Sequence, residues 1–168
     1  MNVLITGGTG FIGYHLSNFH ANKGDNVVIF DNLFKINRNQ DKHIKEIFKR
    51  ENVVFYDVDL SNKIEVDLPF EIDVVYHLAA INGTKLFYTI PYELCKNNIL
   101  ATINLFDFLE GQDIKKIVYS SDCPYNFKDE NKKFSYEKNI LRIKDALNNN
   151  EQDKLDNILF KNAKNFNL

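Results

Sequence analysis

Five short runs of apolar residues recur along the chain, and longer stretches with a different spacing separate them. The runs are rich in β-branched and aromatic residues and are apolar at consecutive positions; they span 3–5, 27–30, 53–56, 74–76 and 117–119. Consecutive apolar positions are typical of strands that are buried on both faces of a parallel sheet. The pattern therefore predicts a parallel sheet with both faces covered.

Three of the intervening stretches are long enough for crossover helices, at 11–23, 42–50 and 92–110. The third begins beside Pro91 and carries its inward-facing positions at helical spacing, at Leu94, Asn98, Ala101, Leu105 and Phe108. Strand–helix–strand repetition with right-handed crossovers gives a doubly wound α/β sheet. For five strands, the simplest spatial order is 3-2-1-4-5.

The character of the sequence changes after Cys123. Residues 124–135 are polar and predict a loop, residues 136–147 predict a helix, and an apolar stripe over 155–166 predicts a second one. We therefore expect an α/β core over residues 1–125. We expect a loop and two helices, a helical C-terminal tail, over residues 126–168.

Composition narrows the classes of partner. The net charge of −2 provides no cationic field that would attract nucleic acid or anionic lipid. A strand begins within three residues of Met1, and no apolar run reaches membrane-spanning length, so we expect a cytoplasmic protein. Cys95 and Cys123 lack metal-binding spacing and are expected to be buried free thiols; no metal site is predicted.

The segment from Thr6 to Gly13, Thr-Gly-Gly-Thr-Gly-Phe-Ile-Gly, joins the first predicted strand to the first helix. Gly7 would permit the tight turn, Gly10 would let the backbone approach a pyrophosphate, and Gly13 would let the helix pack closely against the sheet. The helix N-terminus adds free N–H groups and a partial positive charge. The loop therefore predicts a dinucleotide site.

Asp31 ends the second predicted strand, where the adenosine ribose of a bound dinucleotide would lie. A carboxylate there accepts hydrogen bonds from the ribose hydroxyls and repels a 2′-phosphate. NAD is therefore the predicted cofactor, and Arg38, nearby in sequence, keeps NADP as the alternative. A glycine turn without a ligand is the structural alternative.

The glycine segment resembles the TGxxGxxG signature of the extended short-chain dehydrogenases/reductases, and more specifically of the NAD-dependent nucleotide-sugar epimerases and dehydratases. Further matches follow in chain order: Asp31-Asn32-Leu33, Asp59-Leu60, His77-Leu78-Ala79-Ala80, Asn98 with Ala101-Thr102-Ile103-Asn104-Leu105, and Val118-Tyr119-Ser120-Ser121. The resemblance implies a Rossmann fold. It also implies cofactor contacts from Gly7, Gly10, Phe11, Ile12, Gly13, Asp31, Asn32, Asp59, Leu60, Leu78, Ala79, Ala80 and Asn98.

The same resemblance implies a catalytic Ser or Thr and a Tyr followed four residues later by Lys. The Tyr would take a sugar hydroxyl proton while hydride passes to NAD, and the Lys would lower the pKa of the Tyr. Ser121, with Ser120 second, and Tyr136 fit the first two positions. Ile140 stands where the Lys is expected, and Lys138 points about 200° around the helix.

Family members run to about twice this length, so we expect the C-terminal substrate domain to be missing and residues 126–168 to be its remnant or substitute. Three interpretations stay open. The chain is a nucleotide-sugar epimerase or dehydratase, an NAD-binding module without sugar chemistry, or an interaction protein that kept only the fold. The helical stretches 92–110 and 136–166 are candidate surfaces for a homo-oligomer.

Overall fold

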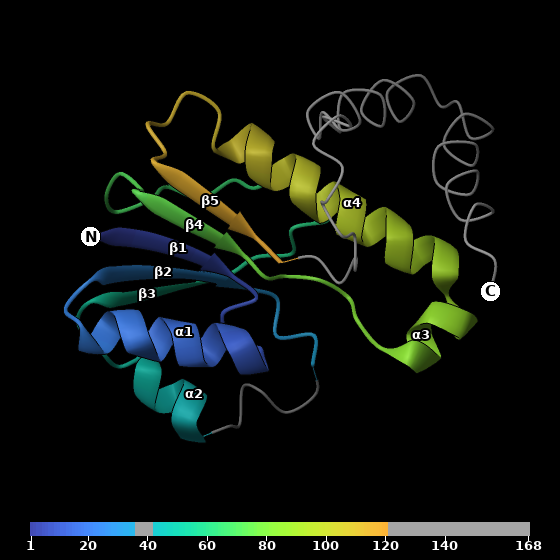
Figure 1. The fold of residues 1–168 in the computed structure, drawn as a ribbon, viewed down its shortest axis with the longest axis horizontal. Helices are drawn as coiled ribbons and strands as arrows, with labels where there is room; N and C mark the ends of the chain where they lie inside the picture. The colour runs from blue at the N-terminus through green and yellow to red at the C-terminus, as the bar shows by residue number, and fades with distance from the viewer. Residues whose placement is uncertain (36–41, 121–168) are drawn as a thin grey trace, which may run out of the picture. The chain divides into compact units, whose positions relative to one another are not determined.

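The computed structural model describes residues 1–35 and 42–120. Its sheet has five parallel strands in the order β3-β2-β1-β4-β5, which confirms the predicted order (Figure 1). The strands are β1 (Asn2–Thr6), β2 (Asn26–Asp31), β3 (Val53–Asp57), β4 (Val74–His77) and β5 (Lys116–Tyr119). Each therefore extends the predicted apolar run by no more than one residue at either end.

The described helices are α1 (Phe11–Asn22), α2 (Lys42–Ile47), α3 (Thr84–Thr89) and α4 (Pro91–Phe108). α1, α2 and α4 correspond to the three predicted crossover helices. α3 was not predicted, because its six residues are too few to show a helical period. Among the described residues, no helix combines the length and the apolar character that crossing a bilayer requires.

Alternate residues of the central strands face two separate hydrophobic clusters, so helices cover both faces of the sheet (Figure 1). Val3, Ile5 and Ile29 pack on one face in a cluster with Ala21 of α1 and Ile47 of α2. On the other face, the strand residues Leu4, Val28, Phe30 and Val75 pack with Ala101, Leu105 and Leu109 of α4 and its end. Full burial of β1 and β2 on both faces explains their consecutive apolar residues.

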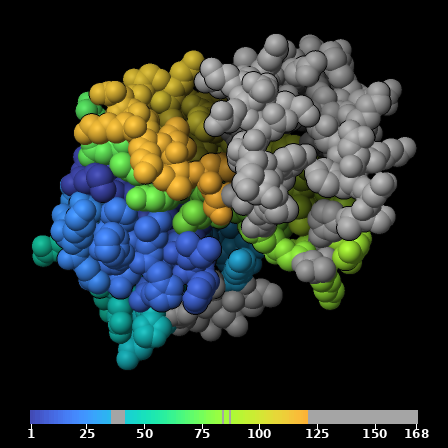
Figure 2. Space-filling model, viewed as in Figure 1, coloured from blue at the N-terminus to red at the C-terminus, as the bar shows by residue number. Residues whose placement is uncertain are grey.

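The same pattern is wrong about the burial of β5. Ile117 is 37% exposed and Tyr119 is 44% exposed, and β5 (orange) lies at the surface in Figure 2. In the part of the chain that the structure describes, β5 pairs with β4 alone. An edge strand has a neighbour on only one side, so its apolar residues need not be buried as those of β1 are. The predicted loop and helices of residues 126–168 lie outside the described residues.

Candidate functional site

A cavity of about 320 Å³ lies beyond the carboxyl ends of β1, β2, β3 and β4. This volume is at the lower end of the range of small-molecule sites. In the order 3-2-1-4-5 the connections leave β1 and β4 in opposite directions, and open α/β sheets bind ligands at such a point. The cavity brings together Gly7, Gly10, Asp31, Asn32, Asp59, Leu60, Leu78, Ala79, Ala80 and Asn98, which are predicted cofactor residues from five separate segments.

The glycine turn is closed by backbone contacts that exclude side chains. Gly7 has a φ of 67°, and a Cβ on it would lie 2.8 Å from the amide nitrogen of Ala79. A Cβ on Gly13 would lie 2.1 Å from the carbonyl oxygen of Gly7. The lack of a side chain at Gly13 therefore lets α1 lie directly against the turn. The turn holds the start of α1 at the mouth of β1.

Phe11, Ile12 and Gly13 do not line the cavity, although they were predicted to contact the cofactor. The side chains of Phe11 and Ile12 are 73% and 64% exposed, so only their backbone is suited to that role. Within the described residues, the amides of Gly7, Gly10 and Tyr14 donate the backbone hydrogen bonds of the turn. The amides of Phe11, Ile12 and Gly13 donate none. The first N–H groups of a helix lack partners in this way and readily bind anions.

Asp31 links the end of β2 to the glycine turn. Its Oδ2 accepts a hydrogen bond from the amide of Thr9 at 3.0 Å, and its Oδ1 accepts one from the amide of Leu33 at 2.9 Å. Each carboxylate oxygen retains a second lone pair, and the half-buried side chain lines the cavity. Asp31 therefore has a fixed orientation and can still accept hydrogen bonds from a ligand.

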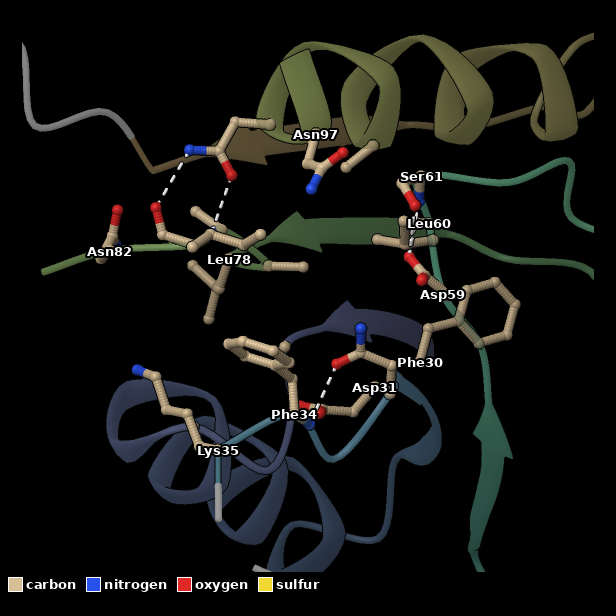
Figure 3. Close-up of a pocket in the computed structure, with 18 of the residues that line it drawn as sticks. Phe30, Asp31, Phe34, Lys35, Asp59, Leu60, Ser61, Leu78, Asn82 and Asn97 are labelled. Carbon is tan, nitrogen blue, oxygen red and sulfur yellow. Dashed lines mark hydrogen bonds between the residues drawn. The ribbon is translucent and has the colours of Figure 1, made fainter. Parts of the chain in front are cut away.

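Two further predicted residues are held by local hydrogen bonds (Figure 3). The Oδ1 of Asp59 accepts hydrogen bonds from the amide of Ser61 at 2.9 Å and from its hydroxyl at 2.8 Å. The amide side chain of Asn98 accepts a hydrogen bond from the N–H of Ile81 at 2.7 Å and donates one to its carbonyl at 3.1 Å. Asn98 thus fixes the segment after β4 and lines the cavity at the same time.

The cavity also contains residues that sequence reasoning missed. Figure 3 shows Phe34 and Lys35 on the same side as Asp31, and Asn82 and Leu78 on the opposite side. Phe34 and Lys35 follow the Asp31-Asn32-Leu33 match directly, so that match could have located them. Asn82 follows the match after β4 in the same way. Lys35 adds a positive charge to a cavity that otherwise carries the carboxylates of Asp31 and Asp59.

His77 does not line the cavity but lies behind its wall, 3% exposed. Its Nδ1 is 2.7 Å from the hydroxyl of Thr6, and its Nε2 is 3.1 Å from the hydroxyl of Thr102. Burial lowers the pKa of His77 to about 4, so the ring is neutral at pH 7. The sequence placed His77 in a motif but gave no indication of these partners.

The model of the NAD dependent epimerase/dehydratase family matches residues 3–143, which is most of the chain. The chain belongs to this family. The family description names the cofactor that the sequence predicts, and the family lies within the extended short-chain dehydrogenases/reductases.

Two relatives of this chain within the family are sugar-nucleotide epimerases. The UDP-glucose 4-epimerase of Bacillus subtilis is 35% identical over 126 residues, which are 73% of this chain and 37% of that protein. The UDP-glucuronate 4-epimerase of Thermodesulfobacterium geofontis is 34% identical over 126 residues, which are 70% of this chain and 38% of that protein. The chain thus spans less than two fifths of the length of these relatives.

Solved structures of the family show the same fold. A UDP-glucose-4-epimerase from Stenotrophomonas maltophila, with bound NAD and formylated UDP-arabinopyranose, aligns with a TM-score of 0.58 and 29% identity. The alignment covers 72% of this chain and 37% of that chain. A UDP-glucose 4-epimerase from Thermotoga maritima, with UDP-glucose, aligns with a TM-score of 0.56 and 28% identity over 72% of this chain and 38% of that chain.

The catalytic residues that the family resemblance implies are not among those that the structure describes. Ser121, Tyr136 and Ile140 lie in residues 121–168, and Arg38 lies in residues 36–41. The second-choice hydroxyl, Ser120, is described and is exposed just beyond β5; its amide donates a hydrogen bond to the carbonyl of His77 at 3.2 Å.

Cys95, predicted to be buried, is half-buried, and burial raises the pKa of its thiol.

Proposed function

We propose that the cavity binds NAD, with the adenosine end beside Asp31, Asn32 and Asp59 and the pyrophosphate at the start of α1. The observation that carries this proposal is the pairing of two features at the end of β1. One is the pair of helix N–H groups at Phe11 and Ile12, which have no backbone acceptor among the residues that the structure describes, and the other is the fixed carboxylate of Asp31. A pyrophosphate needs the first feature and a ribose needs the second.

The residues present fit this cofactor. Gly10 lies at the cavity wall, and among the described residues a Cβ on it would meet only the carbonyl oxygen of Gly7, so its open side faces space that a phosphate can enter. The negative charge of Asp31 favours ribose hydroxyls over a 2′-phosphate and thus NAD over NADP. The structures of family members that contain NAD support the same choice.

The substrate proposed for the chain is a nucleotide-diphosphate sugar, on which it would act as an epimerase or dehydratase. Bound NAD would transiently accept a hydride from a carbon of the sugar. Ser121 would orient the sugar hydroxyl and Tyr136 would accept its proton. Support comes from the sugar-nucleotide epimerases that the chain resembles over about seven tenths of its length.

A second candidate function is an NAD-binding module without sugar chemistry of its own. The observation that favours it is Ile140, which stands four residues after Tyr136, where the resemblance calls for Lys. In this proposal residues 1–125 bind the cofactor in the cytoplasm. Residues 126–168 are the remnant of a substrate domain or its substitute, and a partner or a second copy, associating through 92–110 and 136–166, supplies the rest.

The cofactor proposal is tested by calorimetric titration of the full chain with NAD and with NADP. We expect NAD to bind at least about tenfold more tightly than NADP, and Asp31→Asn to weaken NAD binding by about tenfold, because one charged hydrogen-bond acceptor is lost. Asp57 is the matched control: it lies opposite Asp31 in the β2–β3 register, is exposed and does not line the cavity. Equal losses for Asp31→Asn and Asp57→Asn would contradict the proposal.

The two candidate functions separate in a turnover assay. The protein is incubated with NAD and a panel of UDP-, GDP- and dTDP-sugars, and the products are separated by chromatography. Conversion of a sugar supports the epimerase or dehydratase function. NAD binding without any conversion supports the module that needs a partner.

A further inference from the structure

Three buried side chains form a hydrogen-bonded row behind the cavity wall. Thr6 ends β1 and is fully buried, His77 ends β4 beside it in the parallel register, and Thr102 lies on α4 with 5% exposure. The row joins three elements that each contribute to the site: the strand before the glycine turn, the strand before the Leu78–Ala80 wall, and the helix that carries Asn98.

The donors and acceptors of this row fit together in only one way. The hydroxyl of Thr102 donates its hydrogen to the carbonyl of Asn98 at 3.1 Å, so it must accept from Nε2 of His77. The Oγ1 of Thr6 accepts from the amide of Ala79 at 3.1 Å and from the amide of Leu78 at 3.2 Å, which it shares with the backbone carbonyl of Thr6 at 3.2 Å. Both of its lone pairs are then used, so its own hydrogen must point to Nδ1 of His77.

We propose that His77 is a positioning residue for the cofactor site, in its neutral form with the proton on Nε2. The unprotonated Nδ1 of this ring accepts the hydrogen of the Thr6 hydroxyl. The lone pairs of Thr6 Oγ1 are then directed at the amides of Leu78 and Ala79, which donate to it. The inference rests on the proposed NAD site. The position of the Leu78–Ala80 backbone then depends on a side chain that does not line the cavity.

The backbone of Leu78–Ala80 lies so close to the glycine turn that a shift of Ala79 would displace Gly7. A Cβ on Gly7 would lie 2.8 Å from the amide nitrogen of Ala79, which shows how closely the two backbones approach. If Oγ1 of Thr6 turns away, the amide of Leu78 keeps the backbone carbonyl of Thr6 at 3.2 Å, but the amide of Ala79 loses its acceptor. The backbone of Ala79 is then free to shift against Gly7. Both Gly7 and Ala79 line the cavity, so the shift reaches the cofactor site.

Protonation of His77 would break this arrangement. A cationic ring donates from both nitrogens, and its Nδ1–H would face Thr6, whose lone pairs are already used. The groups that face the ring are the hydroxyls of Thr6 from β1 and Thr102 from α4, and the ring of Tyr119 from β5 at 5.3 Å. Among the described residues no carboxylate bonds to the ring, and the low pKa that burial gives His77 agrees with this.

The tautomer is tested by NMR on the full chain with 15N-labelled histidine. His77 is one of four histidines, and its signals are assigned by comparison with His77→Asn. We expect a protonated Nε2 and an unprotonated Nδ1 at pH 7, with no titration of the ring above pH 5. A protonated Nδ1, or titration near pH 6.5, would overturn the inference.

The effect on the site is tested with Thr102→Val, which keeps the shape of the side chain but removes the acceptor of the Nε2 proton. We expect this change to leave the Nε2–H of His77 without an acceptor and so to shift its 15N signal. NAD binding should weaken about tenfold at a temperature at which the protein is folded, as expected for the loss of one buried hydrogen bond. Thr102→Ser restores the hydroxyl and should rescue both readouts.

Thr89→Val is the matched control. The hydroxyl of Thr89 also donates to the carbonyl four residues earlier, that of Lys85 at 3.0 Å, but it is exposed on α3. It should change neither readout. Unchanged NAD affinity of Thr102→Val would overturn the positioning role, whether or not the 15N signals of His77 move. Wild-type protein that binds no NAD would overturn the proposed function and the positioning role with it, and the NMR result would show separately whether the tautomer was assigned correctly.

Discussion

Substitution of Gly13 by Ala tests the structure of the glycine turn most sharply. The new Cβ would lie 2.1 Å from the carbonyl oxygen of Gly7 and 2.7 Å from the Cα of Gly8, so both obstacles are backbone. The oxygen would have to recede by about 1.3 Å to reach ordinary van der Waals contact. It is held by the amide of Gly10 at 3.0 Å, and the amide of Gly7 is held by Phe30 at 2.8 Å.

The expected cost follows from these contacts. Overpacking against rigid neighbours costs about 1–3 kcal/mol. Loss of the hydrogen bond from Gly10 to Gly7 costs about 1 kcal/mol more. The higher helix propensity of Ala returns about 1 kcal/mol. The free energy of unfolding should therefore fall by about 2 kcal/mol, which corresponds to a decrease of about 1 M in the urea midpoint.

The assay is urea unfolding of the full chain followed by far-ultraviolet circular dichroism. Gly10→Ala is the matched control, because its Cβ would lie 3.1 Å from the same oxygen and meet no other atom of residues 1–35 and 42–120 within 4 Å. It should cost less than about 1 kcal/mol in unfolding free energy and yet weaken NAD binding, since the methyl group enters the proposed pyrophosphate site. Unchanged stability of Gly13→Ala would refute the close packing of α1 on the turn.

The remaining predictions concern acid stability, catalysis and the C-terminal segment. The pKa of His77, about 4 when folded, lies below the 6.5 of a solvent-exposed histidine, so the unfolded chain binds this proton first as the pH falls. Urea unfolding should therefore show a loss of up to about 3 kcal/mol between pH 6.5 and 4, and a flat profile would contradict the burial of a neutral ring. Ile140→Lys should create or raise sugar turnover in the chromatographic assay if Tyr136 holds the catalytic position, and no gain would count against that role. Deletion of residues 151–168 should lower solubility or change the oligomeric state in size-exclusion chromatography; an unaltered monodisperse protein would argue against self-association there.

The sheet could be predicted from the sequence because strands that are buried on both faces have consecutive apolar residues. Leu4 and Ile5 face opposite clusters, and both are fully buried, so consecutive apolar residues marked the strand correctly. The same pattern wrongly predicted that Ile117 is buried, because an apolar run does not show whether its strand has one neighbouring strand or two. α3 escaped notice because six residues are too few to show a helical period.

The candidate site was predictable where a residue type has a local mechanical reason. Gly7 needs its positive φ, and Asp31 follows a buried strand at the correct spacing. The hydrogen-bonded row could not be foreseen, because His77 and Thr102 are 25 residues apart and meet only through the packing of α4 on β4. The predicted catalytic residues Ser121 and Tyr136 lie outside the described residues, so their roles stay predictions.

The most direct test of the account is a crystal structure of the full chain grown with NAD. We predict the adenosine ribose within hydrogen-bonding distance of the Asp31 carboxylate and the pyrophosphate at the amides of Phe11 and Ile12. A dinucleotide bound elsewhere on the chain, or no dinucleotide at saturating NAD, would contradict the proposed NAD site.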